Sequence, residues 1–365
     1  MAVAFSALIE QDQAKEMLRR AIGSGKLAHA YLFRGPAGIG KKTAAQALAA
    51  TLNCRSHQLF TTPDRKPAAS TKPILPRPDL LEACGACPSC RKFASGNHPD
   101  FMEILPEGAA IKIEQIREIK KALVFPPLEA GNRVVLLAEV HTMRREAANS
   151  LLKVLEEPPP STIFILTGDE AGGILPTIVS RCQVIPFFPL SVTHLANILV
   201  LQEKIDQAEA TTLAAVAEGS LSRARILRQK NLLNLRREVL IMLLTYTQEA
   251  PAATVEVLRL AEKCAKLEKY LDDFLDLLSS FFHDLTVYSA AHDHQKAADH
   301  RFPPRPLINQ DLAPLLAHAK DRWNLRDDPD TFSQHREEQL RRAKSQLKRN
   351  CNRTLICEVL FFDLF

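Results

Sequence analysis

Residues 35–43, GPAGIGKKT, contain most of a phosphate-binding loop of the pattern G-x-x-x-x-G-K-[ST]. Glycines let backbone N–H groups point at phosphate oxygens, and the lysine of the pattern reaches the β- and γ-phosphates. The residues available for this are Gly35, Gly38, Gly40 and Lys41. The hydroxyl that should follow and hold Mg²⁺ is replaced by Lys42, whose ammonium has no lone pair and repels a cation. Thr43 lies about 100° further round a helix, so its hydroxyl faces elsewhere.

The apolar stretch VVLLAEV shows a second loss. After such a strand, a phosphate-loop ATPase carries an Asp that supports Mg²⁺ and a Glu that orients the attacking water. Here Ala138 takes the first place and Glu139 the second. Two lost metal-holding positions in an otherwise intact frame favour a retired ATPase over a working one. Lys41 and the glycines leave binding of ATP or ADP open, and a tight strand-to-helix turn without a ligand is the remaining alternative.

Four cysteines have the types and spacing of a metal site. Cys84, Cys87 and Cys90 form C-x-x-C-x-x-C, and Cys54 precedes them. Four thiolates make a closed structural zinc site, and the close spacing lets neighbouring thiolates converge on one ion. An iron–sulfur cluster is the chemical alternative, and a set of small buried apolar side chains is the structural one. The remaining cysteines lack such spacing and are expected to be buried free thiols: Cys182, Cys264, Cys351 and Cys357.

These residues need a frame, and apolar patterning predicts one. Buried strands are expected at 28–33, 133–140 and 162–168, and helices at 10–23, 41–53, 111–123 and 145–157, with a short strand before 111. Strands that alternate with helices predict a parallel sheet covered on both faces. Residues 55–83, rich in Pro, Ser, Thr and Lys, read as a mobile surface insertion. After Pro189 the strand signals fade, which predicts short helices to 230 and longer ones from 232.

Length and composition set limits on the class of protein. The 365 residues exceed one ordinary core, and 46% hydrophobic with 24% charged residues is a globular composition. A net charge of +5 permits contact with nucleic acid without requiring it. The N-terminus lacks a secretory signal, and no run of about 18 apolar residues would span a membrane. We therefore expect a cytoplasmic protein with reduced thiols.

Several motifs together resemble bacterial clamp-loader subunits. HAYLFRGPAGIGKK, the four cysteines, SGNHPDF, NSLLKVLEEPP and SRCQ occur in the order found in that family, and RNCNRTLICEVLFFDL resembles its C-terminal end. Members are AAA+ proteins that place the sliding clamp of the replicative polymerase on DNA. The resemblance implies an α/β phosphate-loop domain with an inserted zinc module at 1–190, a small helical lid at 191–230 and an all-α collar for oligomerisation at 231–365.

The departures from the family pattern favour one of its branches. The motor branch, tau/gamma, keeps an intact loop and a carboxylate pair, whereas this chain has Lys42 and Ala138. The second-sensor arginine of the family is replaced by Ser222, with Arg223 one place later. The chain therefore resembles the delta-prime branch, which implies a non-catalytic stator within the DNA polymerase III holoenzyme and no intrinsic ATPase activity.

The resemblance also assigns roles and partners. Arg181 in SRC corresponds to an arginine finger that serves a neighbouring motor subunit's ATP site, and Thr167 falls at the first sensor. Without the family, Arg181 reads as an ordinary ion pair and Thr167 as a strand residue. The implied partners are motor and delta subunits in a hetero-pentameric ring, with the sliding clamp and primed DNA and without a membrane. The helix at 114–121 would lie near the central chamber, with Gln115, Arg117, Lys120 and Lys121 towards DNA.

Two rival functions remain at this point. The first is an active clamp-loader ATPase of the tau/gamma type, which the pair Lys42 and Ala138 disfavours. The second is a stand-alone zinc DNA-binding module, which the position of the cysteines inside an α/β domain disfavours.

Overall fold

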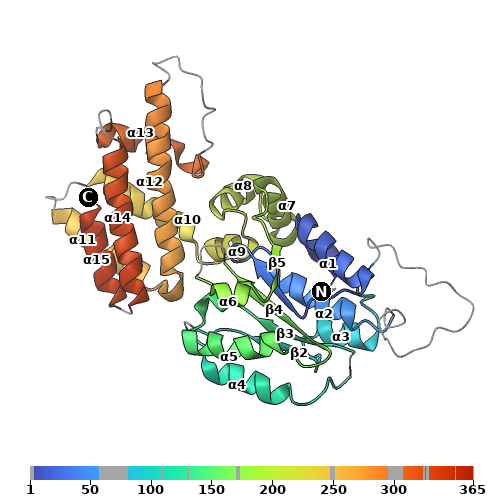
Figure 1. Ribbon diagram of the computed structural model, residues 1–365. Coiled ribbons are helices and arrows are strands. Elements are labelled where there is room, and N and C mark those ends of the chain that lie inside the picture. The colour runs from blue at the N-terminus through green and yellow to red at the C-terminus, as the bar shows by residue number, and fades with distance from the viewer. Residues whose placement is uncertain are drawn as a thin grey trace, which may run out of the picture. The chain divides into compact units, whose positions relative to one another are not determined.

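The structure, a computed structural model, describes residues 4–56, 81–108, 110–129, 131–169, 173–246, 251–294, 307–323, 325, 329–349 and 351–364. The chain divides into two compact units, Met1–Ser191 and Val192–Phe365 (Figure 1). Most of the predicted surface insertion, residues 57–80, lies outside the described residues.

The first unit is built on a parallel sheet of five strands in the order β2-β3-β4-β1-β5. The strands are β1 Ala30–Arg34, β2 Phe101–Ile104, β3 Arg133–Leu137, β4 Thr162–Gly168 and β5 Gln183–Pro186. In register, Leu32 lies beside Leu166 on β4, and Leu136 lies beside Ile165. The predicted parallel sheet is confirmed, and all of its strands therefore end at the same edge.

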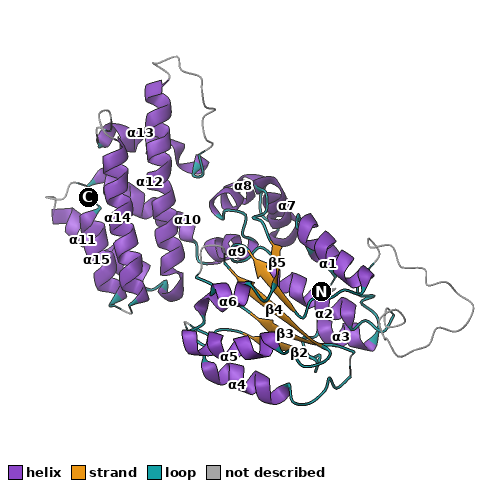
Figure 2. Cartoon of the chain, in the orientation of Figure 1, coloured by secondary structure: helices purple, strands orange, loops and turns teal. Residues whose placement is uncertain are grey.

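Helices cover both faces of this sheet (Figure 2). The helices of this unit are η1 Phe5–Ala7, α1 Asp12–Ser24, α2 Lys41–Leu52, α3 Pro88–Ala94, α4 Ile113–Ala122, η4 Val140–Thr142, α5 Arg145–Glu156 and α6 Pro176–Val179. One core joins the strand residues Tyr31 and Phe33 to α1 and α2. The other joins their neighbours Ala30 and Leu32 to α4, α5 and α6. The alternation of side chains along a strand assigns successive residues to opposite layers.

Strand boundaries differ from the prediction where the backbone turns or the sheet ends. β3 stops at Leu137 instead of residue 140, because Glu139 has the left-handed φ of 55° and Val140 begins a 3-10 helix. β5 was not predicted as a strand, because an edge strand is only partly buried and lacks a continuous apolar run.

The second unit is entirely helical in the part that the structure describes. Its helices are α7 Val192–Glu203, α8 Gln207–Val216, α9 Leu221–Gln229, α10 Leu232–Thr245, α11 Pro251–Ala265, η5 Glu268–Tyr270, α12 Leu271–His294, η6 Gln310–Leu312, α13 Ala313–Arg322, α14 Pro329–Lys348 and α15 Arg353–Asp363. The predicted fold class, α/β followed by all-α, is confirmed. The division into a lid at 191–230 and a collar from 231 stays a prediction.

A buried polar network joins three segments of this unit. The guanidinium of Arg236 on α10 is fully buried and donates to Asp311 Oδ2 at 2.5 Å and to Asn309 Oδ1. Asn309 in turn donates from its backbone N–H to Asp284 Oδ2 on α12 at 2.6 Å. Burial lowers the pKa of Arg236, and Asp311 opposes this shift.

Among the described residues, no helix is long and apolar enough to cross a lipid bilayer.

Candidate functional site

The glycine turn connects β1 to α2 in a conformation that only glycine tolerates. Gly35 has φ of 153°, and a Cβ at this position would lie 2.3 Å from the carbonyl oxygen of Phe187. Gly40, with φ of 104°, is the N-cap residue of α2. The strand, turn and helix that a phosphate loop requires are therefore all present.

Lys41 folds back onto the loop that precedes it. Its Nζ donates to the carbonyl oxygen of Pro36 at 2.5 Å and also to that of Gly35. Burial lowers the pKa of Lys41, while the charges of Asp169 and Glu139 oppose the shift. Two of the three donors of this ammonium are thus engaged, which leaves one for an incoming phosphate.

Lys42 points to a different partner. Its Nζ forms an ion pair with Glu103 Oε1 on β2. The position that holds Mg²⁺ in a working loop is thus occupied by a cation that the chain itself neutralises. Thr43 is partly buried one residue further along α2.

The ends of β3 and β4 lie beside each other at the same edge of the sheet. Ala138 is buried, so this position contributes a methyl group where a carboxylate would support a metal. Glu139 is exposed and its backbone N–H donates to Thr167 Oγ1 at 3.1 Å. The structure therefore links Glu139 and Thr167 directly, through the backbone of the first and the hydroxyl of the second.

Two residues at this edge were missed from the sequence. Asp169 follows β4, and its charge acts on Lys41. Its backbone N–H lies 3.4 Å from Nδ1 of His141, which follows β3 in η4. The available signal was their place directly after two predicted strands, since parallel strands end at one edge.

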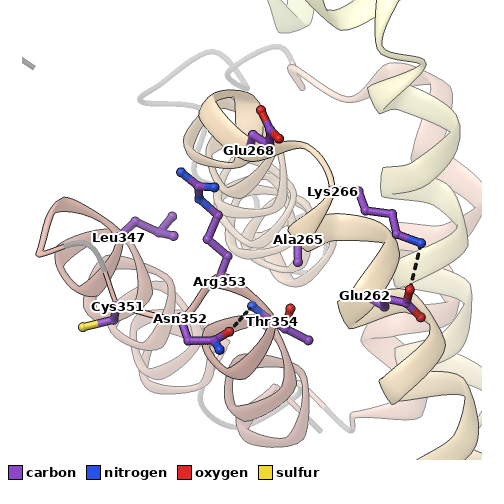
Figure 3. Close-up of a pocket in the computed structure, with 9 residues that line it drawn as sticks. All are labelled: Glu262, Ala265, Lys266, Glu268, Leu347, Cys351, Asn352, Arg353 and Thr354. Carbon is purple, nitrogen blue, oxygen red and sulfur yellow. Dashed lines mark hydrogen bonds and ion pairs between the residues drawn. The ribbon is translucent and has the colours of Figure 1, made fainter. Parts of the chain in front are cut away.

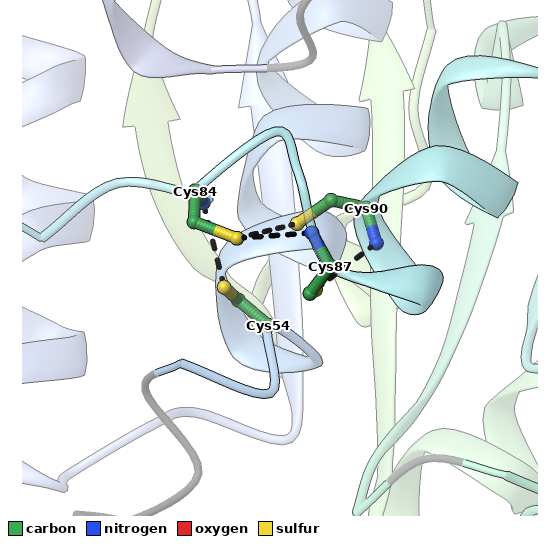
Figure 4. A group of neighbouring side chains, drawn as sticks. All are labelled: Cys54, Cys84, Cys87 and Cys90. Atoms are coloured by element: carbon green, nitrogen blue, oxygen red, sulfur yellow. Dashed lines mark hydrogen bonds between the residues drawn. The ribbon is translucent and has the colours of Figure 1, made fainter.

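The four predicted metal ligands meet beside α2 and α3 (Figure 4). Their Sγ atoms all lie within 4.8 Å of one another, and those of Cys84 and Cys90 are 3.9 Å apart. A tetrahedral zinc site with Zn–S bonds of about 2.3 Å has sulfur atoms about 3.8 Å apart. The cluster can therefore hold a metal ion with small movements of the side chains.

Backbone groups stabilise negative charge on these sulfur atoms. The backbone N–H of Cys87 donates to Cys84 Sγ at 3.3 Å, and that of Cys90 donates to Cys87 Sγ at 3.4 Å. A hydrogen bond with Ser56, followed by those from the backbone of Cys87 and Ala86, lowers the pKa of Cys84 to about 5. A thiolate is the form that binds a metal, so Cys84 is prepared for that role.

The other four cysteines differ in how far they are buried. Cys264 and Cys357 are buried, as predicted, but Cys182 is only partly buried and Cys351 is exposed. The prediction of a buried thiol is wrong for Cys351, because this residue lies in the connection that precedes Asn352, the N-cap of α15.

The SGNHPDF motif joins the cysteine segment to the sheet. His98 stacks on Phe93 of α3 with ring centroids 4.1 Å apart, and its Nε2 lies 3.1 Å from Ser89 Oγ. Asp100, which is fully buried, accepts hydrogen bonds from the backbone N–H groups of Leu128 and Glu129 at 2.7 and 2.8 Å. The motif therefore has a structural role.

Arg181 lies on the surface between α6 and β5. Its side chain is 34% exposed, and its NH2 group forms an ion pair with Glu156 Oε1 at 2.5 Å. Its NH1 group donates to the carbonyl oxygen of Thr177 at 3.0 Å. The guanidinium is thus presented to solvent while two of its nitrogens are held by the chain.

The four polar side chains of α4 that were predicted to face DNA differ in their surroundings. Gln115 accepts a hydrogen bond from the backbone N–H of Lys112 and donates to the carbonyl oxygen of Leu105, so it caps the helix. Lys120 donates to Ser150 Oγ on α5 at 3.0 Å. Arg117 and Lys121 are exposed. Of the predicted DNA-facing set, these last two are the most accessible.

The helical unit has a polar cavity of about 650 Å³ between the end of α11 and the start of α15 (Figure 3). Lys266 forms an ion pair with Glu262 at 2.8 Å, and Asn352 Oδ1 accepts from the backbone N–H of Thr354 at 3.0 Å. None of the residues predicted for a site lies in this cavity.

Arg223 follows Ser222, the position that the resemblance assigns to the second sensor. It forms an ion pair with Glu218 at 3.4 Å.

Comparisons with known proteins agree with the motifs. A family model described as DNA polymerase III, delta subunit, matches residues 10–191. The chain is 30% identical over 250 residues to DNA polymerase III subunit delta' of Bacillus subtilis (strain 168), covering 65% of this chain and 69% of that protein. It is 38% identical over 162 residues to subunit delta' of Pseudomonas aeruginosa, covering 44% of this chain and 43% of the relative.

Subunits named tau/gamma are also similar to this chain. Subunit tau/gamma of Haemophilus influenzae is 32% identical over 223 residues, covering 60% of this chain and 29% of that protein. The solved structures that are similar include a gamma subunit-related protein of Thermotoga maritima, at 21% identity and a TM-score of 0.35, covering 85% of this chain and 99% of that one. On the match to the Bacillus protein and the family model, the chain belongs to the family of DNA polymerase III delta-prime subunits.

Proposed function

We propose that this chain is the non-catalytic stator of a clamp loader, which serves the ATP site of a neighbouring motor subunit and hydrolyses no ATP itself. The proposal rests on family membership together with the loss of the groups that seat a metal. The relatedness to tau/gamma subunits supports a motor subunit as the neighbour.

The observation that carries the proposal is the pairing of Lys42 with Glu103. Hydrolysis in phosphate-loop enzymes needs Mg²⁺ between the β- and γ-phosphates. At this position the chain offers an ammonium, and at the end of β3 it offers the buried methyl group of Ala138. No substitute hydroxyl follows, because Thr43 occupies a different side of α2. Nucleotide binding through Lys41 and the glycines remains compatible with these losses.

Arg181 is the group that we propose to act on the neighbour. A guanidinium supplied across an interface stabilises the charge that develops on the γ-phosphate, and such arginines raise rates by about 10³–10⁵ in related systems. Its surface position and its lack of contact with the chain's own phosphate loop, among the contacts described, support this role.

We propose that the cysteine cluster holds one structural zinc ion. The donors Cys54, Cys84, Cys87 and Cys90 fill a tetrahedral shell, so no open position remains for a reacting water. The metal would fix α3 and the connection from α2 and would take no part in hydrolysis.

The partners that we propose are motor and delta subunits in a ring of five, together with the sliding clamp and primed DNA. In such an assembly Arg117 and Lys121 of α4 would lie towards DNA phosphates. A replication complex of this kind acts on the chromosome, which places the chain in the cytoplasm.

Two measurements test this function. ATP turnover by the isolated chain should be absent, and steady turnover that is lost on Lys41→Ala would instead favour the tau/gamma-like ATPase. A loader rebuilt with Arg181→Ala should assemble but load clamps slowly, because one motor site then lacks its arginine. Wild-type loading by that variant would return Arg181 to an ordinary interface residue.

A further inference from the structure

Arg181 does not stand alone on the surface. Its NH2 group is bound by Glu156 and its NH1 group by the carbonyl oxygen of Thr177. We propose that Glu156 is a positioning residue, which holds the Arg181 guanidinium in the orientation that the neighbour's nucleotide requires. This inference rests on the proposed function of Arg181 and adds a second residue to the same site.

Glu156 is attached to a well-packed helix. It is the last residue of α5, whose apolar side chains Leu151 and Leu155 are buried in the sheet core. The helix ends there because Glu157 leaves helical geometry, with φ of −125° and ψ of 72°. The carboxylate of Glu156 therefore projects from a rigid helix end towards the segment that carries Arg181.

Thr177 gives the guanidinium a second anchor from α6. An arginine has five N–H donors in a planar fork. In Arg181, NH2 donates to Glu156, and NH1 donates to the carbonyl oxygen of Thr177 and, at 3.4 Å, to Ser180 Oγ. The remaining donors stay available for phosphate oxygens. Because a free arginine side chain loses much rotamer freedom when it is ordered, prior orientation by two acceptors lowers the barrier to productive docking.

The matched control lies one residue away. Glu157 is exposed and carries the same charge, and no hydrogen bond or ion pair of its side chain occurs in the part of the chain that the structure describes. Glu156→Ala and Glu157→Ala therefore change the local charge equally, and only the first removes a contact with Arg181.

The experiment uses the complete loader rebuilt with each variant, and it measures the rate of clamp loading on primed DNA against ATP concentration. Glu156→Ala should lower the maximal rate about threefold to tenfold, with the half-saturating ATP concentration unchanged. Glu156→Gln keeps an acceptor oxygen and should stay within about twofold of wild type, as should Glu157→Ala. In the Arg181→Ala background, Glu156→Ala should have no further effect.

The outcomes separate this inference from the function on which it rests. Wild-type loading by Glu156→Ala, alongside slow loading by Arg181→Ala, would overturn the positioning role alone. A faster rate in Glu156→Ala would mean that the carboxylate sequesters the arginine, and it would also overturn the role. Equal losses in Glu156→Ala and Glu157→Ala would indicate an effect of net charge, and an additive loss in the double variant would indicate action through another residue.

Discussion

Three residues of the phosphate-loop region lack the groups or the freedom to bind a metal ion. Lys41 binds the carbonyl oxygens of its own loop, Lys42 binds Glu103, and Ala138 is buried. Both ammonium groups therefore have acceptors within the chain. We therefore propose that this loop serves as a scaffold, and that the charge that acts on a neighbour's nucleotide lies at Arg181.

Arg181→Lys should fail nearly as badly as Arg181→Ala in clamp loading by a rebuilt loader. A lysine carries the same charge, but it cannot bridge two phosphate oxygens with a planar fork. It also cannot reach Glu156 and Thr177 with two separate nitrogens, as Arg181 does. Loading by the lysine variant near the wild-type rate would show that only the positive charge matters.

At the scale of the elements, the sequence predicted some strands and missed another. β1, β3 and β4 are buried on both faces and have continuous apolar runs, so their type and order followed from the pattern. β5 is an edge strand with one fully buried residue and has no such continuous apolar run. The early end of β3 depends on the left-handed backbone at Glu139. Residues other than glycine adopt this conformation in only a few per cent of cases, so the apolar pattern did not indicate it.

The candidate site followed from the sequence where motif and spacing define the chemistry. The phosphate-loop residues and the cysteine cluster were found in this way, since consecutive spacing and element context fix their geometry. The contacts of Lys42 with Glu103 and of Arg181 with Glu156 were not found. Such pairs join distant segments, and they depend on side-chain directions that only the folded chain determines.

The cysteine segment should contain one zinc ion per chain, measurable by elemental analysis. Cys87→Ser should lose the metal and loosen α3, because a hydroxyl is a poor zinc ligand in a thiolate shell. Acidification should also release the ion, because protons compete with the metal for the sulfurs. Full zinc content in Cys87→Ser protein, or normal folding of metal-free protein, would contradict this role.

Asp100, in the SGNHPDF motif that follows α3, should stabilise the segment between the cysteines and the sheet. Its carboxylate is fully buried, binds two backbone N–H groups and lies 3.8 Å from the guanidinium of Arg133. Asp100→Ala should lower the free energy of unfolding by about 3 kcal/mol, because it leaves buried donors without an acceptor. Glu129→Ala, which removes an exposed ion pair with Lys92, should lower the free energy of unfolding far less, because solvent screens that pair. Equal denaturation midpoints for the two variants would refute the difference.

For the whole molecule, the function that we propose requires an assembly in which several surfaces of the chain act together. The sequence has a net charge of only +5, which permits contact with DNA without requiring it. We propose that any such contact depends on a few exposed basic residues. The exposed pair Arg117 and Lys121 on α4 is available for such a contact, whereas Lys120 is engaged with Ser150.

The assembled loader should accordingly lose DNA affinity when Arg117 and Lys121 are both changed to Gln. Each lost phosphate contact should reduce the slope of log affinity against log salt concentration by about 1, and the loss should not depend on DNA sequence. Lys120→Gln is the matched control, because that ammonium already donates to Ser150 and should contribute little to the slope. The measurement is binding of primed DNA by the rebuilt loader at several salt concentrations. An unchanged slope in the double variant would place α4 away from DNA, and it would leave the arginine at position 181 as the functional contact that we propose for this chain.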